Sequence, residues 1–351
     1  KTFGTSSIML GDATTGTIDA ADYNTGLGID VFAALTTGDN NSVLGFSAGN
    51  DLTTGEQNTF IGTNAGQQIT TGDKNIALGQ SALLVATTGD KNTMLGHRAG
   101  AAITTVGENT FVGNEAGEST TTGGVNTFVG HQAGEANTTG ASNVFVGTGA
   151  GDANTTGAKN SAVGVNALGA NTTGPNSTAV GFGALASHTT AGNNTAVGYQ
   201  AGNAVTTGDQ NVYIGQDAGK LATTGSNTAV GAVAFSTQIL GTRNTALGYG
   251  AMQLAGGDGA SNLLVNNTAV GHQAMYNFDK DDCTAVGMAS LFTMTTGTRN
   301  VAVGGGAGYG ITSGADNTTL GLNAGYAITT GVRNVCVGKF AGGYLTTGGD
   351  N

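Results

Sequence analysis

The segment NTAVGYQAGNAVTTGDQ, residues 194–210, is one complete copy of the unit that decides the fold. When the sequence is aligned on the glycine at the fifth place of this unit, Gly198 here, it contains twenty copies, and most of these glycines are 17 residues apart. Two steps of 16 residues and one of 23 lie between Gly215 and Gly287. Self-similarity at a fixed short period is typical of solenoids, in which each repeat forms one coil.

The consensus of the repeat, numbered as positions 1 to 17, is N-T-x-V-G-x-x-A-G-x-x-x-T-T-G-x-x. Position 1 is Asn in seventeen copies, position 4 is Val, Leu or Ile in all twenty, position 5 is Gly in all twenty, and position 8 is Ala in seventeen. We therefore expect these four positions to be the structural residues of every coil. They are represented by Asn58, Asn126, Val112, Val197, Gly113, Gly198, Ala116 and Ala201.

Positions 1 to 4 predict a short strand, in which alternate side chains point to opposite faces. Position 4 is aliphatic throughout, so we expect it to point into the coil. Position 3, on the other face, is also mostly apolar, as at Phe60 and Phe111. Two apolar faces indicate that both are covered. A single thin coil has one interior, so we expect the second face to pack against an identical chain.

The remaining consensus positions predict turns and a ladder of side chains. Gly at position 5 indicates a tight bend, and Ala at position 8 suggests a second short strand with room for only a small side chain. The TTG at positions 13 to 15 suits a strand end followed by a turn. Asn at position 1 is expected to stack on the Asn of the next coil, where amide groups can satisfy one another by hydrogen bonds.

The sequence therefore predicts an all-β fold, a parallel β-solenoid or β-roll of about twenty 17-residue coils, forming a homotrimeric fibre. A helical alternative is poor, because Gly occurs two or three times in each repeat and costs about 1 kcal/mol in a helix interior. We expect one repetitive domain over residues 1–351, with an irregular zone at about 232–282.

The irregular zone is the candidate contact loop. The repeat over 244–266 is six residues longer than the others, and the repeat over 267–282 lacks TTG. Insertions in solenoids form loops on one face, often the binding face. A neutral insertion and a Ca²⁺ site made by neighbouring aspartates are the alternatives. The candidate contact residues are Asp258, Tyr276, Phe278, Asp279 and Lys280.

The composition excludes several classes of protein. Gly is 64 of 351 residues, but it has no period of three and Pro occurs once, so the chain is not collagen. The aliphatic residues recur at a fixed phase, which argues against disorder. The net charge of −11 argues against nucleic acid as a partner, and no run of 18 apolar residues predicts a membrane span. Cys283 and Cys336 lie in different coils, and we expect two buried residues without a disulfide.

No catalytic motif is present in the sequence. We found no P-loop, GxSxG or HExxH pattern and no carboxylate pair in phase with the repeat. His97, His131 and His272 all fall at position 6, which is otherwise variable, so we expect them to be exposed rather than metal ligands. The prediction is a non-enzymatic protein with no catalytic residues, no cofactor and no metal.

The segments NTAVGYQAG at 194–202 and NTAVG at 227–231 resemble two related sets of repeats. One is the repeat in the heads of YadA-like trimeric autotransporter adhesins, and the other is the repeat of phage tail fibres and of proteins with a C-terminal intramolecular chaperone. The likeness to YadA-like heads implies a trimer of β-rolls used for attachment to surfaces. The 17-residue period is longer than theirs, and no membrane anchor or stalk is visible.

We therefore expect a structural fibre and attachment protein, most closely a phage tail fibre or similar extracellular filament. The alternatives are a bacterial trimeric adhesin head, an ice-binding β-solenoid that uses the TTG threonines, and a polysaccharide-cleaving β-helix. The expected partners are two identical chains, flanking fibre or virion proteins, and a cell-surface receptor or glycan. The expected location is the virion, the extracellular space or the cell surface.

Overall fold

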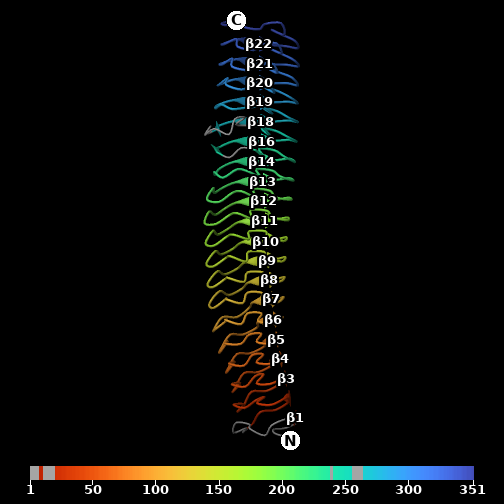
Figure 1. Cartoon of the computed structure of the whole chain (residues 1–351), viewed down its shortest axis with the longest axis vertical. Helices are drawn as coiled ribbons and strands as arrows, with labels where there is room; N and C mark the ends of the chain where they lie inside the picture. Colours follow the sequence, from red (N-terminus) through yellow and green to blue (C-terminus); the bar gives the residue numbers. More distant parts are fainter. Residues whose placement is uncertain (1–7, 11–19, 238–239, 255–263) are drawn as a thin grey trace. The chain divides into compact units, whose positions relative to one another are not determined.

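The structure, a computed structural model, describes residues 8–10, 20–237, 240–254 and 264–351. These residues form an all-β parallel solenoid and contain no helix, which confirms the predicted fold class. The chain divides into two compact units, Lys1–Asn176 and Ser177–Asn351. Within each unit, the strands of successive coils stack on one another along the axis of the solenoid (Figure 1).

The described residues of the first unit form ten strands of three residues, and each strand pairs in parallel with the strand of a neighbouring coil. The register advances by one repeat, so that Thr110 pairs with Thr127 and Val112 with Val129. The strands are β1 (Ile8–Leu10), β2 (Thr25–Leu27), β3 (Ser42–Leu44), β4 (Thr59–Ile61), β5 (Ile76–Leu78), β6 (Thr93–Leu95), β7 (Thr110–Val112), β8 (Thr127–Val129), β9 (Val144–Val146) and β10 (Ser161–Val163).

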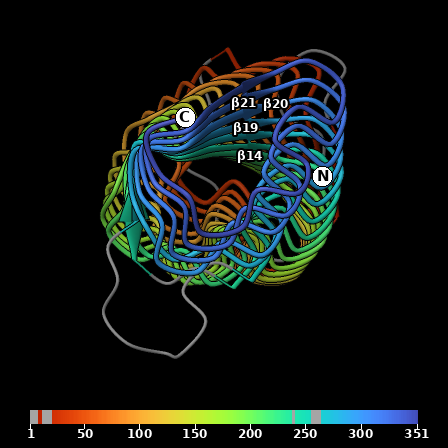
Figure 2. The ribbon, with the colours of Figure 1, turned by 90° about the horizontal axis from the view of Figure 1, so that it is seen from above.

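The second unit has the same arrangement and one additional pair of short strands. Its strands lie on one side of the coil when the unit is seen from above (Figure 2). The main strands are β11 (Thr178–Val180), β12 (Thr195–Val197), β13 (Val212–Ile214), β14 (Thr228–Val230), β16 (Thr245–Leu247), β18 (Thr268–Val270), β19 (Thr284–Val286), β20 (Val301–Val303), β21 (Thr318–Leu320) and β22 (Val335–Val337). The additional pair is β15 (Gly241–Thr242) with β17 (Leu264–Val265).

The long repeat does not disturb the register of the main sheet. Strand β16 pairs with β18 position by position, so Thr245 is opposite Thr268 although 23 residues separate them. Strands β15 and β17 come just before β16 and β18 in the chain and also pair in parallel, so the two coils are paired there as well. The six additional residues of this repeat therefore leave the pairing of the main strands unchanged.

The predicted direction of the position 4 side chain is wrong. The middle residue of each strand, position 3, is buried, whereas positions 2 and 4 point outward; Phe111 is fully buried and Val197 is 36% exposed. The alternation was predicted correctly, but its phase was reversed. Phe and Tyr at position 3 need the interior of the coil more than Val or Leu do, since they bury more apolar surface.

The second short strand expected at position 8 is also absent. The described residues around position 8 form turns, with left-handed backbone on both sides of Ala116, at Glu115 (φ 58°) and Gly117 (φ 58°). These two left-handed residues reverse the chain and place Ala116 in the core, where it is fully buried. Position 8 is thus a core position, and it also admits a larger side chain, since Val31 is buried at the same place in another coil.

The Asn ladder is confirmed. Asn126 donates its side-chain amide to the carbonyl of Gly140 at 2.9 Å, and its side-chain oxygen accepts a hydrogen bond from the backbone N–H of Asn143 at 2.8 Å. The same contacts recur from coil to coil in each unit, as at Asn58 and Asn317. The buried amide thus satisfies turn and strand groups that would otherwise lack partners.

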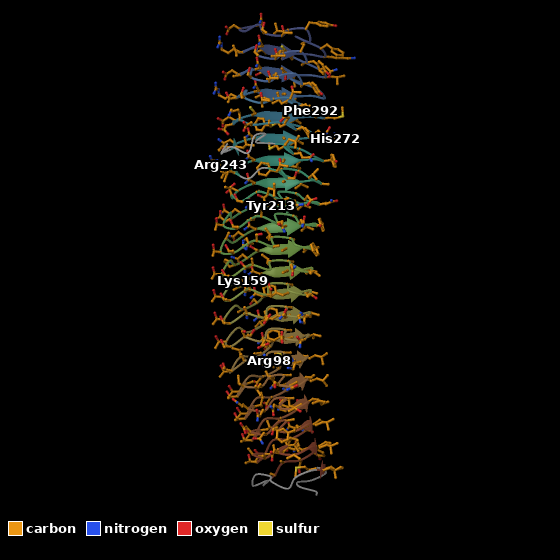
Figure 3. All side chains as sticks on the ribbon, in the orientation of Figure 1. Arg98, Lys159, Tyr213, Arg243, His272 and Phe292 are labelled. Atoms are coloured by element: carbon orange, nitrogen blue, oxygen red, sulfur yellow. The ribbon has the colours of Figure 1, made fainter. Side chains whose placement is uncertain are left out.

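Side chains repeat in phase from coil to coil (Figure 3), and those that point inward form the columns of the core. Position 3, position 8 and position 12 all point inward, and position 12 holds Leu52, Ile69 and Ile103 in successive or nearby coils. The two cysteines take core positions as well. Cys283 and Cys336 are buried and free, which confirms that they form no disulfide.

Candidate functional site

The outward face of the main sheet presents a surface of uniform chemistry in each unit. Position 4 of successive coils places Leu, Val or Ile on this face, and most of these side chains are at least a third exposed. Position 2 adds Thr, Ser, Val or Ile beside them. The exposed members of the position 4 column are Leu10, Leu27, Leu44, Leu78, Leu95, Val163, Val180, Val197, Ile214, Leu247, Leu320 and Val337.

This outward sheet face, defined as positions 2 and 4 of the described coils, carries no charged residue. The acidic excess of the chain therefore lies elsewhere, on the turns and corners. Monomeric proteins rarely expose contiguous apolar patches of more than a few hundred Å². A continuous uncharged face with an exposed aliphatic column is suited to packing against another protein surface.

The residues predicted from the consensus serve the coil rather than a binding site. Asn58, Asn126 and Ala201 are buried, and Gly113 and Gly198 have φ values of 144° and 136°, which favour glycine. The exceptions are the position 4 residues Val112 and Val197, which belong to the outward sheet face.

The candidate contact loop does not form one cluster. Asp258 lies outside the described residues. Phe278 is 1% exposed and occupies a core position, so it is not available for contact, whereas Asp279 and Lys280 form a loose ion pair with their charged atoms 4.0 Å apart. Tyr276 directly follows a turn and is stacked on Phe292, with ring centroids 5.1 Å apart.

The aspartates beside this loop are not arranged as a calcium site. Asp281 accepts a hydrogen bond from the backbone N–H of Val265 at 2.7 Å, and Asp282 accepts one from Asn266 at 3.0 Å. Both carboxylates therefore stabilise the neighbouring coil. His97, His131 and His272 are exposed, as expected for a variable surface position.

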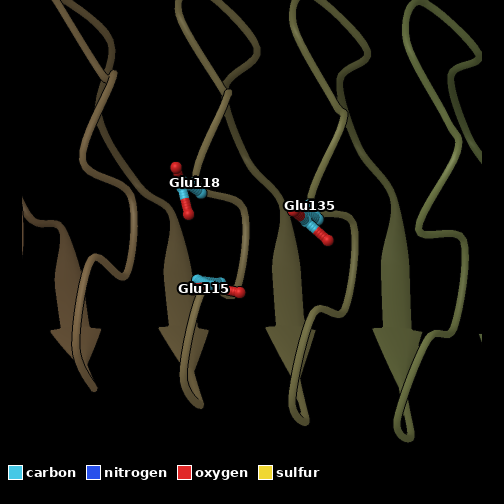
Figure 4. Close-up of side chains that lie close together, drawn as sticks. All are labelled: Glu115, Glu118 and Glu135. Atoms are coloured by element: carbon cyan, nitrogen blue, oxygen red, sulfur yellow. The ribbon is translucent and has the colours of Figure 1, made fainter.

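Among the described residues, one acidic cluster has side-chain oxygens close enough to share a cation. Glu115 and Glu118 lie on one coil and Glu135 on the next (Figure 4), with one ligand atom of each within 4.8 Å of the others. Burial raises the pKa of Glu135, and the neighbouring carboxylates of Glu115 and Glu118 raise it further. Arg98 pairs with Glu118 at 2.5 Å, so part of the negative charge is already neutralised.

Position 12 contains a buried polar column that the consensus did not reveal. Asn154 donates to the side-chain oxygen of Asn137 at 2.8 Å, and Asn171 donates to that of Asn154 at 2.8 Å. In the second unit, position 12 holds the buried His188, whose Nε2 lies 3.1 Å from the side-chain amide of Asn194. These polar residues replace aliphatic ones at the same place, so no motif distinguishes them in the sequence.

No family model matches the chain, and no match was found among characterised proteins. No helix among the described residues has the length and apolar character needed to cross a membrane. The candidate site therefore rests on the geometry of the coils, and its strongest feature is the outward sheet face.

Proposed function

We propose that this chain is a non-enzymatic structural fibre and attachment protein, most closely a phage tail fibre or similar extracellular filament. The observation that carries the proposal is the outward sheet face, which repeats an exposed aliphatic column beside uncharged position 2 residues in both units. We infer that this face packs against identical faces of two further chains in a homotrimer. A repetitive coil that offers one uniform face is suited to self-association over many coils.

The chemistry of the remaining surface supports a mechanical rather than a catalytic role. The exposed corners carry ion pairs between successive coils, such as Lys91 with Glu108 at 3.3 Å and Arg299 with Asp316 at 2.7 Å. Only about 9% of the residues are charged, and they are dispersed along the coils. In this proposal the partners at the ends are flanking fibre or virion proteins, and a cell-surface receptor or glycan is the target.

A bacterial trimeric adhesin head is the second candidate, since the NTAVG segments resemble those repeats too. The ice-binding alternative gains little support, because in most coils only the second of the two residues at positions 13 and 14 is well exposed. Thr71 is exposed, whereas Thr70 is half-buried and donates its hydroxyl to the carbonyl of Thr87 at 3.1 Å. One exposed threonine in most coils gives a single column rather than a broad array.

The mass of the protein in solution tests the proposal. Light scattering coupled to size-exclusion chromatography is expected to give three times the chain mass of 34.2 kDa, independent of dilution in the micromolar range. A mass equal to one chain at all concentrations would rule out the trimeric fibre. The sequence of the flanking gene segments then separates the two candidates, because an adhesin requires a membrane anchor and a tail fibre lies among virion genes.

A further inference from the structure

Position 10 of four consecutive coils in the second unit carries an aromatic side chain. Successive rings of this aromatic ladder, defined as Tyr276, Phe292, Tyr309 and Tyr326, have centroids 5.1, 5.1 and 5.0 Å apart. The interplanar angles are 4°, 2° and 12°, so the rings are almost parallel. The ladder lies on the turn that follows position 8, whereas the outward sheet face is formed by positions 2 and 4.

The backbone holds the four rings in register. The carbonyl of each ladder residue accepts a hydrogen bond from the N–H at position 11 of the preceding coil. The donors are Leu254 to Tyr276 at 2.8 Å, Asn277 to Phe292 at 3.1 Å, Thr293 to Tyr309 at 3.2 Å and Gly310 to Tyr326 at 3.0 Å. The ring positions are therefore fixed by the coil, so that little side-chain freedom is lost when a ligand binds.

The rings present their edges to solvent. Each face of Phe292 and Tyr309 is covered by a neighbouring ring, yet both side chains are only half-buried and Tyr326 is 43% exposed. Gly250 and Gly306 lie beside the ladder, and a Cβ at these positions would be 3.7 Å from the rings of Tyr276 and Tyr326. The exposed part of the ladder is thus a comb of parallel ring edges.

The edge of an aromatic ring carries partial positive charge, and its face carries partial negative charge. A planar aromatic molecule that lies flat across the comb therefore makes a favourable edge-to-face contact with each ring in turn. Sugars are less well suited to this surface, because they pack on ring faces and these faces are occupied. The net charge of −11 disfavours an anionic ligand.

We propose that the aromatic ladder binds an elongated, planar, neutral or cationic aromatic molecule whose long axis follows the column of rings. The length of the ladder selects this ligand over small aromatics, because the molecule must reach several rings at 5 Å intervals. The other exposed aromatic stacks are shorter: Phe182 with Tyr199 offers two rings, 5.5 Å apart. The Phe111, Phe128 and Phe145 stack is buried and inaccessible.

The test uses the full chain and thioflavin T, a cationic planar dye that fluoresces when its rings are held coplanar. We expect saturable fluorescence from the natural sequence, and a Kd at least tenfold higher for Tyr309→Thr, which breaks the ladder at its centre. Tyr309→Phe keeps the ring and is expected to bind like the natural sequence. The matched control is Tyr199→Thr, which removes a ring from the two-ring stack and is expected to leave the Kd unchanged.

Circular dichroism and the mass in solution are recorded for every variant, so that failure of the proposed trimer is distinguished from failure of the ladder. If Tyr309→Thr does not fold, Tyr326→Ala shortens the ladder from its end and is expected to weaken binding by a smaller factor. Equal dye affinity in the ladder variants and the natural sequence overturns the proposal. An equal loss in Tyr199→Thr overturns it as well, because binding would then not depend on the ladder.

Discussion

At the scale of single residues, the glycine at position 5 is the strictest requirement of the coil. Gly113 has a φ of 144°, and a Cβ at this residue would lie 2.2 Å from the carbonyl oxygen of Gly130 in the next coil. Both the backbone angle and the close approach exclude any side chain. This double constraint explains why the glycine is present in all twenty copies while most other positions vary.

We predict that Gly113→Ala lowers the free energy of unfolding by at least about 3 kcal/mol, because strain and overlap with Gly130 add together. The control is Gly124→Ala in the same unit, where a Cβ would lie 3.5 Å from the nearest atom. This variant is expected to change stability by less than about 1 kcal/mol. Urea denaturation followed by circular dichroism measures both, and similar losses in the two variants would contradict the explanation.

The buried His188 predicts a pH dependence of stability. Burial lowers the pKa of His188 to about 4, from about 6.5 in an unfolded chain. The unfolded state therefore binds the proton more readily, and stability is lost as the pH falls from about 6.5 towards 4. The full effect is about 3 kcal/mol, since one pKa unit corresponds to about 1.4 kcal/mol.

The comparison variant is His188→Val, because position 12 of the following coil is the buried Val205. Titrating carboxylates are common to both proteins, so the difference between their stabilities isolates the histidine. We expect this difference to shift in favour of the variant between pH 7 and pH 4.5, as measured by urea denaturation. A difference independent of pH would show that His188 does not remain neutral in the fold.

At the scale of the coil element, most coils place a large side chain at either position 3 or position 9 and a small residue at the other. Phe128 at position 3 lies against Gly134 at position 9, where a Cβ would be 2.6 Å from the ring. In several coils with Ala at position 3 the large residue is at position 9 instead, as at Ala162 with the buried Leu168. Each such coil thus contains one large side chain at one of two places, which preserves close packing.

We predict that this exchange can be made artificially in one coil. Phe128→Ala is expected to cost about 3–5 kcal/mol through the cavity it leaves, and Gly134→Leu alone is expected to destabilise by overlap with Phe128. The double variant is expected to recover at least about 2 kcal/mol relative to the sum of the single changes. Leucine is compatible with the left-handed backbone there, since Leu168 has a φ of 53°.

Thermal or urea unfolding of the four proteins in this cycle measures the coupling between the two positions. Additive losses would mean that the ring and the position 9 side chain do not share one cavity. Phe128 also stacks between Phe111 and Phe145, with centroids 4.6 and 4.9 Å away, so complete recovery is not expected.

The sequence predicted the period, the parallel coils and the Asn ladder, because each of these depends on residues that recur at one position. It did not predict which strand face is inside, because positions 3 and 4 are both apolar and alternation alone does not fix the phase. The pairing of Phe128 at position 3 with Gly134 at position 9 would identify the inner face. A large side chain at position 3 packs against a glycine at position 9 because the two positions share the same space in the core. The aromatic ladder and the buried Asn154 and His188 were missed, because they occupy variable positions that carry no motif.

At the scale of the whole molecule, the two units present the same kind of outward sheet face, uncharged and with exposed aliphatic side chains such as Leu95 and Leu247. Each coil contacts its neighbours through the same hydrogen bonds, so stability is approximately a sum over neighbouring coils. The exposed aliphatic residues contribute little to this sum in an isolated chain. In the proposed trimer, contacts with other chains account for their recurrence at position 4.

This explanation predicts that a charge at position 4 prevents assembly without unfolding the coil. Val197→Lys places an ammonium group in the centre of the outward sheet face, where packing against another chain would remove it from water without a partner. The side chain already points outward, so the isolated coil tolerates the change. We expect the mass from light scattering to fall from three chains to one, while circular dichroism remains that of the natural protein.

Thr207→Lys is the matched control, because this exposed threonine lies at position 14 of the same coil, outside the outward sheet face. It introduces the same charge at the same level of the second unit and is expected to leave the mass unchanged. A trimer that persists in Val197→Lys would mean that the chains associate through another surface. Dissociation in both variants would mean that added positive charge, rather than its place on the sheet face, disrupts the assembly.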